Sequence, residues 1–241
     1  MPSVEDMDII TVDGLTKRYG RIVAVEDLSF ALAPGRVTGF VGRNGAGKTT
    51  TLRMLLGLTR PTCGTATIGG RTYAELADPL RHVGALIDPN CFHPGRSGRN
   101  ALGAIARMAR IGTGRVDEVL GLVDLTGAAG RRVGGYSLGM RHRLALAAAL
   151  LGDPATLVLD EPANGLDPFG VRWLRALIRG LGEQGRSVLV SSHALAELAL
   201  AVDDVIVIEK GRLVAHEPMA GLSRDGESLE DAFMRLTGVT Q

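Results

Sequence analysis

The sequence has few aromatic residues and almost no net charge. Aromatic residues make up 4% of the 241 residues, and the formal net charge is +1. A protein that binds nucleic acids through a broad basic surface carries a clear excess of positive charge, and proteins that bind single strands present aromatic side chains on which bases stack. Both absences argue against nucleic acid as a partner.

Cysteine and long apolar runs are also scarce. The two cysteines, Cys63 and Cys91, have no C-x-x-C spacing, which argues against a disulfide framework or a metal site and favours a reducing compartment. The stretch from Met1 to Asp8 is acidic and contains no apolar run, so we expect no secretory signal there. The longest apolar run, Leu144 to Leu151, is far shorter than the ~20 residues that cross a bilayer. Any work on a membrane would therefore require another chain.

Lysine is the third scarce residue. Of the 27 basic residues, 24 are arginine and three are lysine. Codon bias is the simplest explanation, because the two side chains serve equally well on most surfaces. Lys48 nevertheless stands out, since an arginine-rich chain has a lysine there. The remaining composition, with 45% hydrophobic and 22% charged residues, is typical of a globular protein.

Two regions of different character make up the first 150 residues. The first 90 residues are rich in short β-branched runs that are separated by Gly, Pro and Asp, with one helix from near Lys48 to just before Gly57. The strands expected there are Ile9 to Val12, Ile22 to Val25, Val37 to Val41, Ala66 to Ile68 and Val83 to Ile87. From about 95 to 150, Ala, Leu, Arg and Gly dominate, which predicts an inserted helical region with helices at 98–110, 115–123 and 138–151.

After residue 150, strand and helix patterns alternate, which is typical of a parallel sheet with crossover helices. The expected elements are strands at Thr156 to Leu159, Ser187 to Val190 and Val205 to Ile208, and helices at 168–182 and 194–200. Asp167 and Pro168 form an N-cap and a first helical residue. Near the C-terminus, Ser228 and Asp231 have the spacing of a capping box, and the apolar stripe behind them predicts a docking helix.

Residues 42–49 read Gly-Arg-Asn-Gly-Ala-Gly-Lys-Thr, which matches the phosphate-loop pattern G-x-x-x-x-G-K-[ST] between an expected strand and an expected helix. Glycines let the backbone turn tightly, so that successive N–H groups and the positive end of the helix face anionic oxygens. Lys48 would bind the β- and γ-phosphates, and the Thr49 hydroxyl would bind Mg²⁺. A glycine-rich turn with an incidental lysine is the less specific interpretation. The candidate nucleotide-binding residues here are Gly42, Arg43, Asn44, Gly45, Ala46, Gly47, Lys48, Thr49 and Thr50.

Two adjacent carboxylates, Asp160 and Glu161, follow the expected strand Thr156 to Leu159. Adjacent acids repel unless a cation or a proton intervenes, and Mg²⁺ held between nucleotide oxygens and Asp160 would supply that cation. Glu161 would then be free to act as a general base toward the attacking water. His193 follows another apolar strand, and at the same carboxyl edge of the sheet it would contact the γ-phosphate. Acids at a strand end and single histidines are usually solvated or structural, so this interpretation depends on the phosphate loop.

With these motifs in this order, the sequence resembles the nucleotide-binding domain of ABC transporters over nearly its whole length. Residues 42–50 resemble the Walker A segment, Asp160 and Glu161 resemble Walker B with its catalytic glutamate, and His193 resembles the switch histidine. Gly165-Leu166-Asp167 resembles the D-loop. Tyr19, which we place before the first strand pair, matches an aromatic residue that stacks on adenine in the family. The segment 136–140, Tyr-Ser-Leu-Gly-Met, lies where the family has its signature, usually Leu-Ser-Gly-Gly-Gln.

The resemblance implies a fold, a reaction and partners. The fold would be α/β, a P-loop NTPase core with an N-terminal antiparallel β subdomain and an inserted α-helical subdomain. One ABC ATPase domain, 1–241, would contain a RecA-like/β lobe (1–88 and 151–222), a helical signature lobe (89–150) and a C-terminal docking helix (223–241). The chain would hydrolyse ATP with Mg²⁺ as a homodimer on a separate integral membrane permease, at the cytoplasmic face of the cell membrane. Ser137, Gly139 and Asp167 would contribute to nucleotide sites shared by two copies, with Ser137 and Gly139 preceding a helix whose positive end approaches the γ-phosphate.

Two departures from the family pattern are informative. Leu138 and Met140 replace a glycine and a glutamine in the signature, and Asp88 occupies the position of the Q-loop glutamine. Both features resemble the branch of single-domain exporters for bacitracin, lantibiotics and related antibiotics. That branch usually has Tyr-Ser-Leu-Gly-Met in the signature and Glu at the position of the Q-loop glutamine. Asp88 is one methylene shorter than Glu, and we expect it to bind Mg²⁺ or the lytic water with reduced reach, and basal ATP hydrolysis to be slow.

Two other functions fit part of the pattern. A soluble ABC protein that acts on ribosomes or DNA would carry two such domains or a long coiled-coil insertion, and neither is present. A module that senses ATP without hydrolysing it would not need Lys48, Asp160, Glu161 and His193 together. The transported compound does not follow from this chain, since the substrate path would lie in the membrane partner.

Overall fold

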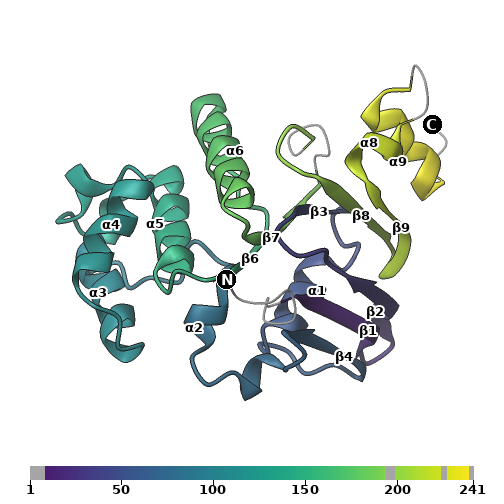
Figure 1. The fold of residues 1–241 in the computed structure, drawn as a ribbon, viewed down its shortest axis with the longest axis horizontal. Coiled ribbons are helices and arrows are strands. Elements are labelled where there is room, and N and C mark those ends of the chain that lie inside the picture. The colour runs from purple at the N-terminus through teal and green to yellow at the C-terminus, as the bar shows by residue number, and fades with distance from the viewer. Residues whose placement is uncertain (1–8, 194–198, 224–226, 239–241) are drawn as a thin grey trace.

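The computed structural model describes residues 9–193, 199–223 and 227–238. Its first part is a small antiparallel sheet with the strand order β2-β1-β4 (Figure 1). The strands are β1 (Ile10–Tyr19), β2 (Ile22–Ala31) and β4 (Cys63–Ile68). β1 and β2 form a long hairpin, so the expected strands at both positions exist but are longer than expected. Gly14 and Asp27, which look like breaks in the sequence, have positive φ angles and lie at irregularities inside the strands.

The second sheet has six strands in the order β5-β6-β7-β3-β8-β9. They are β3 (Val37–Val41), β5 (Val83–Leu86), β6 (Thr156–Leu159), β7 (Ser187–Ser192), β8 (Asp204–Glu209) and β9 (Arg212–Pro218). β5, β6, β7, β3 and β8 are parallel, as expected, and β9 is antiparallel to β8. Because the central strands are parallel, their carboxyl ends meet at one edge of the sheet.

The helices lie around the two sheets, and three of them form a separate group (Figure 1). This group contains α3 (Gly98–Met108), α4 (Gly114–Leu122) and α5 (Leu138–Leu150), close to the three helices expected in the inserted region. The other helices are α1 (Lys48–Leu55), α2 (Pro79–His82), α6 (Pro168–Glu183), α8 (Met219–Leu222) and α9 (Leu229–Thr237). The structure thus confirms an α/β fold with an antiparallel β part and an inserted helical part.

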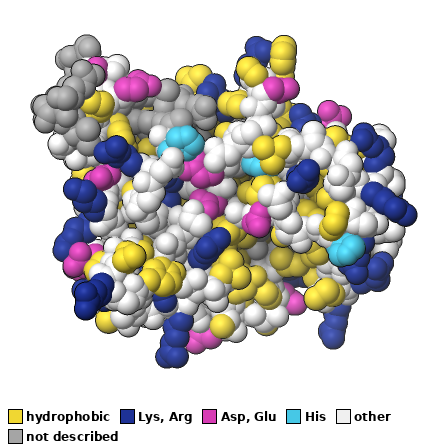
Figure 2. All heavy atoms as spheres, turned by 180° about the vertical axis from the view of Figure 1, so that it is seen from behind, with side chains coloured by type: hydrophobic (Ala, Val, Ile, Leu, Met, Phe, Trp, Pro, Cys, Tyr) yellow, Lys and Arg dark blue, Asp and Glu magenta, His cyan; other side chains and the backbone are white. Residues whose placement is uncertain are grey.

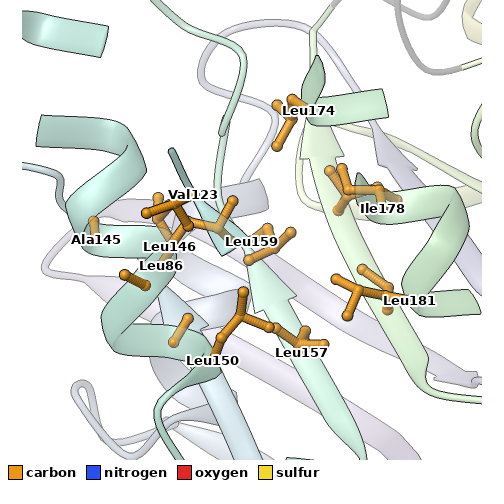
Figure 3. Close-up of a cluster of buried hydrophobic side chains, with 14 of the residues drawn as sticks. Leu86, Val123, Ala145, Leu146, Leu150, Leu157, Leu159, Leu174, Ile178 and Leu181 are labelled. Carbon is orange, nitrogen blue, oxygen red and sulfur yellow. The ribbon is translucent and has the colours of Figure 1, made fainter. Parts of the chain in front are cut away.

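The large sheet is apolar on both faces, because helices or the second sheet cover each side. Leu157 and Leu159 of β6 pack in one core with α5 and α6, as Figure 3 shows for Leu150 and Ile178. Val158, between those two leucines, belongs to a second core shared with α1 and the antiparallel sheet. The strict alternation along β6 shows that one strand serves two cores.

Among the described residues, the α-helices α2 and α8 and the strand β9 are short elements that the sequence analysis does not predict. β9 pairs with β8 through a tight turn, and its exposed outer residues leave little hydrophobic signal in the sequence.

The helix expected at 194–200 falls mainly on residues 194–198, which lie outside the described residues, as does the stretch 1–8. α9 begins after Ser228, whose Oγ accepts the Asp231 N–H at 3.1 Å, as expected for a capping box. Within the described parts of the chain, none of the helices combines the length and apolar character that spanning a bilayer requires.

Candidate nucleotide site

Three loops carry the candidate residues to one edge of the large sheet. The phosphate loop follows β3, Asp160 and Glu161 follow β6, and His193 follows β7. β7 lies between β6 and β3 and is parallel to both, so the three loops leave neighbouring strands at the same edge. The tertiary structure thereby brings together side chains that are about 30 to 150 positions apart in the sequence.

The phosphate loop ends in the N-terminus of α1. Gly45 and Gly47 have φ angles of +82° and +105°, which side chains with a Cβ rarely adopt. The first backbone hydrogen bond of the helix joins the Thr51 N–H to the Gly47 carbonyl at 2.9 Å, so the N–H groups of residues 48–50 precede the helical ladder. An added Cβ on Gly45 would meet no atom within 4 Å, which leaves that side of the loop open. The loop can therefore bind an anion through backbone N–H groups and the helix dipole.

Glu161 links the phosphate loop to His193. Its Oε1 lies 3.2 Å from Lys48 Nζ, and its Oε2 lies 2.9 Å from His193 Nδ1. The Lys48 side chain is only 6% exposed, and its Nζ donates to the Gly42 carbonyl at 2.6 Å. Glu161 has a φ angle of +46°, a strained conformation for a residue other than glycine, and such strain is often found at functional sites. A carboxylate is thus held beside the phosphate loop between two basic groups.

Ser191 is a site residue to which the sequence analysis assigns no role. Its Oγ donates to Asp160 Oδ1 at 2.6 Å and accepts the Glu161 N–H at 2.9 Å. Ser191 is fully buried in β7, and Asp160 is 8% exposed. The only sequence signal was its position two residues before His193, at the end of an apolar strand. Ser191 holds both members of the acidic pair in place from the neighbouring strand.

Replacing Ser191 with Ala should lower the turnover number for ATP about tenfold, because a lost hydrogen bond to a buried charged group costs about 1–3 kcal/mol. Steady-state kinetics with thermal unfolding would measure this. Ser187→Ala is a matched control, since Ser187 is a buried serine of the same strand that accepts the Gly35 N–H far from the site. Equal turnover in the two variants would mean that Ser191 does not position the acidic pair.

A cavity of about 220 Å³ lies between the phosphate loop and Glu161. Its walls also include Ala24 of β2 and Asn164, whose N–H donates to the Glu161 carbonyl at 3.1 Å. A second cavity, of about 460 Å³, lies on the outer side of the loop, beside His193 and the turn between β8 and β9. On the face shown in Figure 2, acidic side chains and a histidine gather near the middle of the surface, where the molecule is hollowed.

The donor set at the cavity fits a nucleotide with Mg²⁺. Among the described residues, no group of three His, Cys, Asp or Glu side chains could hold a metal ion alone. Thr49, which lines the cavity, and Asp160 supply a hydroxyl and a carboxylate, the oxygen ligands that Mg²⁺ prefers together with phosphate oxygens and water. An ion at this position would therefore need the nucleotide to complete its coordination.

Tyr19 and Asp88 lie away from this cavity. Tyr19 was expected to precede the strand pair, but it is the last residue of β1, at the tip of the hairpin. Its side chain is half exposed, and Lys17 Nζ lies 4.9 Å from its ring centroid. The Asp88 carboxylate accepts the Asn90 N–H at 2.8 Å and lines a separate groove of about 390 Å³ between α1 and α5. In that groove, partial burial and the Asp88 charge both raise the pKa of the Cys91 thiol, so the thiol stays protonated. Neither side chain reaches the phosphate loop in this structure.

The remaining predicted residues begin two helices. Ser137 caps α5, since its Oγ accepts the Met140 N–H at 3.2 Å, and Asp167 caps α6 by accepting the Gly170 N–H at 2.7 Å. Gly139 was expected to precede the helix together with Ser137, but it is the second residue of α5. Ser137 is exposed, and neither it nor Asp167 lines the phosphate cavity. These helix ends are therefore available to another molecule.

Comparisons with known proteins relate the whole chain to a family and to solved structures. The family described as "ABC transporter" matches residues 25–164. The bacitracin transport ATP-binding protein of Bacillus licheniformis is 41% identical over 90% of this chain and 72% of its own length. The lantibiotic transport ATP-binding protein of Streptococcus pyogenes is 30% identical over 93% of this chain and 96% of its own length. A solved ATP-binding subunit of an ABC transporter superposes with a TM-score of 0.85 at 23% identity, over 95% of this chain and 99% of that one.

Proposed function

The chain belongs to the ABC transporter family, and we propose that ATP-driven closure of a dimer of this chain moves a separate membrane permease. The permease would export an antibiotic, a peptide or another hydrophobic compound. It is an ATPase subunit of the exporter branch, to which its bacitracin and lantibiotic relatives belong. The chain is similar to transport proteins over most of its length, and this favours a transporter over a soluble ABC protein of the ribosome or of DNA.

The main support for the proposed mechanism of ATP hydrolysis is the position of Glu161. Its carboxylate lies beside the phosphate loop and is oriented by Lys48 and His193. There it would accept a proton from a water that attacks the terminal phosphorus, while Lys48 and the N–H groups of the loop stabilise the charge on the phosphate oxygens. Mg²⁺ bound with the nucleotide would supply further charge stabilisation. His193, which is 43% exposed and contacts Glu161, would hold the γ-phosphate from the other side of this carboxylate.

The dimer is proposed because the signature residues do not line this chain's own cavity. Leu138 is 44% exposed at the start of α5 and lies against the D-loop, since an added Cβ on Gly165 would clash with it. Phe169, at the start of α6, is 73% exposed. Exposed apolar residues beside two helix N-termini fit a surface that a second copy covers, with Ser137 and Gly139 then facing its bound phosphates.

The groove that contains Asp88 is the proposed docking surface for the permease, at the cytoplasmic face of the membrane. It is lined by residues of α1, β5 and α5 and by Leu58, which follows α1 and is 64% exposed. It therefore lies between the proposed RecA-like/β lobe (1–88 and 151–222) and the proposed helical lobe (89–150). A helix of the permease seated there would sense a change in the angle between the lobes.

Replacing Asp88 with Gln should change the coupling of hydrolysis to transport more than the basal rate, because its carboxylate lies in the groove and not at the phosphate loop. The slow basal hydrolysis of the isolated protein should stay within about threefold of its original value, less than ~1 kcal/mol. Stimulation by the reconstituted permease should fall. If neither turnover nor coupling changes, the Asp88 side chain has no role.

Phosphate release from ATP by the purified chain, with Mg²⁺ and then with a chelator, tests the proposed function. The expected result is slow hydrolysis that stops when Mg²⁺ is removed. Binding of ATP without phosphate release, also in the presence of the permease, would instead identify a sensor. A reading frame for a protein with several apolar spans beside this one would support the permease partner.

A further inference from the structure

The phosphate loop is in backbone contact with a turn that none of the motifs includes. This turn joins β8 to β9 and consists of Lys210 and Gly211. The Gly211 N–H donates to the Ala46 carbonyl in the phosphate loop at 2.9 Å. On its other side, the Gly211 carbonyl accepts the Glu26 N–H of β2 at 2.8 Å. The turn thus connects the loop to the antiparallel sheet.

The contacts leave no room for a side chain at Gly211. It has a φ angle of +78°, and an added Cβ would lie 2.8 Å from the Ala24 carbonyl oxygen and 2.9 Å from the Val25 Cα. Both are backbone atoms, which cannot move aside as the end of a flexible side chain can. Any residue with a Cβ would therefore push the turn away from β2 and strain its hydrogen bond to Ala46.

The phosphate loop is held by the same elements at two further glycines. An added Cβ on Gly47 would lie 2.6 Å from the Ala24 oxygen, and one on Gly42 would lie 2.5 Å from the Ile208 oxygen at the end of β8. The beginning of the loop thus rests on β8, and its end rests on β2. Gly211 lies where these two supports meet.

Two further features brace the turn. Lys210 and Gly211 have φ angles of +49° and +78°, the positive values that a tight two-residue hairpin turn requires at both central residues, so the turn has one defined conformation. Beside it, Arg212 Nη2 forms an ion pair with Glu26 Oε2 at 2.9 Å. The turn is therefore fixed in position against both β2 and the phosphate loop.

We propose that Gly211 is a positioning residue for nucleotide binding, because its turn holds the phosphate loop in the conformation in which the loop's N–H groups face the phosphates. This inference rests on the proposed function. It adds a requirement outside the motifs: the anion-binding loop needs a partner from the β8–β9 hairpin. Since Gly211 contacts the loop through a backbone hydrogen bond to Ala46 and does not line the phosphate cavity, it acts on phosphate affinity through the backbone and contributes no group to the reaction.

Gly211→Ala tests the proposal, with Gly185→Ala as its matched control. Gly185 has a φ angle of +81°, but an added Cβ there would meet no atom within 4 Å, and it precedes β7 at the opposite edge of the sheet. Both variants carry the same backbone strain, and only the first disturbs the loop. The measurements are the KM for MgATP, the kcat, and the affinity for MgADP and for inorganic tripolyphosphate.

The expected result for Gly211→Ala is a roughly tenfold or larger loss of affinity for all three ligands, with a kcat at saturation within about threefold of wild type. An equal loss for tripolyphosphate places the effect on the phosphates and not on the base. Gly185→Ala should lose thermal stability but keep the affinities of the wild type. If Gly211→Ala is folded and binds all three ligands like the wild type, or if both variants lose affinity equally, the proposal is wrong.

If Gly211→Ala does not fold, Arg212→Gln tests the proposal. This variant keeps every backbone contact and removes only the ion pair to Glu26. Its control is Arg99→Gln, which breaks an exposed ion pair to Asp117 far from the loop. We expect Arg212→Gln to raise the KM for MgATP about threefold and to speed amide exchange in residues 42–49. Wild-type values for both would overturn the proposal. A wild-type protein that binds no nucleotide would refute the proposed function itself, which distinguishes the two failures.

Discussion

Replacing Glu161 with Gln is expected to lower ATP hydrolysis by about 10²–10⁴-fold, the usual contribution of a general base. Glutamine has nearly the same shape as glutamate but cannot accept the proton of the attacking water. The amide can still lie between Lys48 and His193, so the phosphate loop should keep its conformation. The affinity for MgATP should therefore change little, and the measurement is phosphate release together with equilibrium binding of ATP.

The same variant should also show the oligomeric consequence of blocked hydrolysis. If closure of the dimer requires ATP and opening requires hydrolysis, Glu161→Gln should remain dimeric with MgATP, while the wild type returns to the monomer. Light scattering during the reaction measures this. Glu183→Gln, an exposed glutamate of α6 that pairs with Arg179, should hydrolyse ATP like the wild type. Retained hydrolysis in Glu161→Gln would remove Glu161 from its assigned role.

Replacing Lys48 with Ala should abolish useful ATP binding, with a loss of about 10²-fold or more. The ammonium group is almost completely buried between the loop carbonyls and Glu161, where it can reach the phosphates. Without it, the phosphate oxygens lose a charge-assisted hydrogen bond, and the carboxylate of Glu161 is left to repel them. Binding of a fluorescent ATP analogue and phosphate release would show the loss.

Lys48→Arg separates charge from geometry. The guanidinium group is larger and planar, and the 6% exposure of Lys48 leaves little space for it, so this variant should also bind poorly. Thermal unfolding must show that both variants are folded. If Lys48→Ala still bound and cleaved ATP like the parent protein, the phosphate loop would not hold the nucleotide, and the ATPase function would be wrong.

Much of the site follows from the sequence, because its main residues belong to local patterns. The phosphate loop needs glycines at particular spacings between a strand and a helix, and a reader can recognise that requirement without the fold. Asp160, Glu161 and His193 each follow an apolar strand, so their place at a sheet edge was predictable. The structure confirms that they meet there.

Other parts of the site could not be predicted, since they depend on contacts between distant segments. Ser191 matters because β7 lies beside β6, which brings its hydroxyl to Asp160 and to the Glu161 N–H. Asp88 is at the expected position in the sequence, but its side chain turns into the groove between α1 and α5. The sequence pattern places Tyr19 before the strand pair instead of at the end of β1, because the Gly and Asp residues inside the hairpin resemble the ends of strands.

The family, the phosphate loop and most of the strands and helices follow from the sequence, since these depend on hydrophobic periodicity and on residues such as glycine whose backbone preferences are local. The strand order, which sets what Ser191 and Gly211 touch, is visible in the fold alone. A short local pattern does not specify a contact between the β8–β9 turn and the phosphate loop, because the two segments are more than 160 positions apart. Such contacts arise only when packing of the two cores brings the strands together.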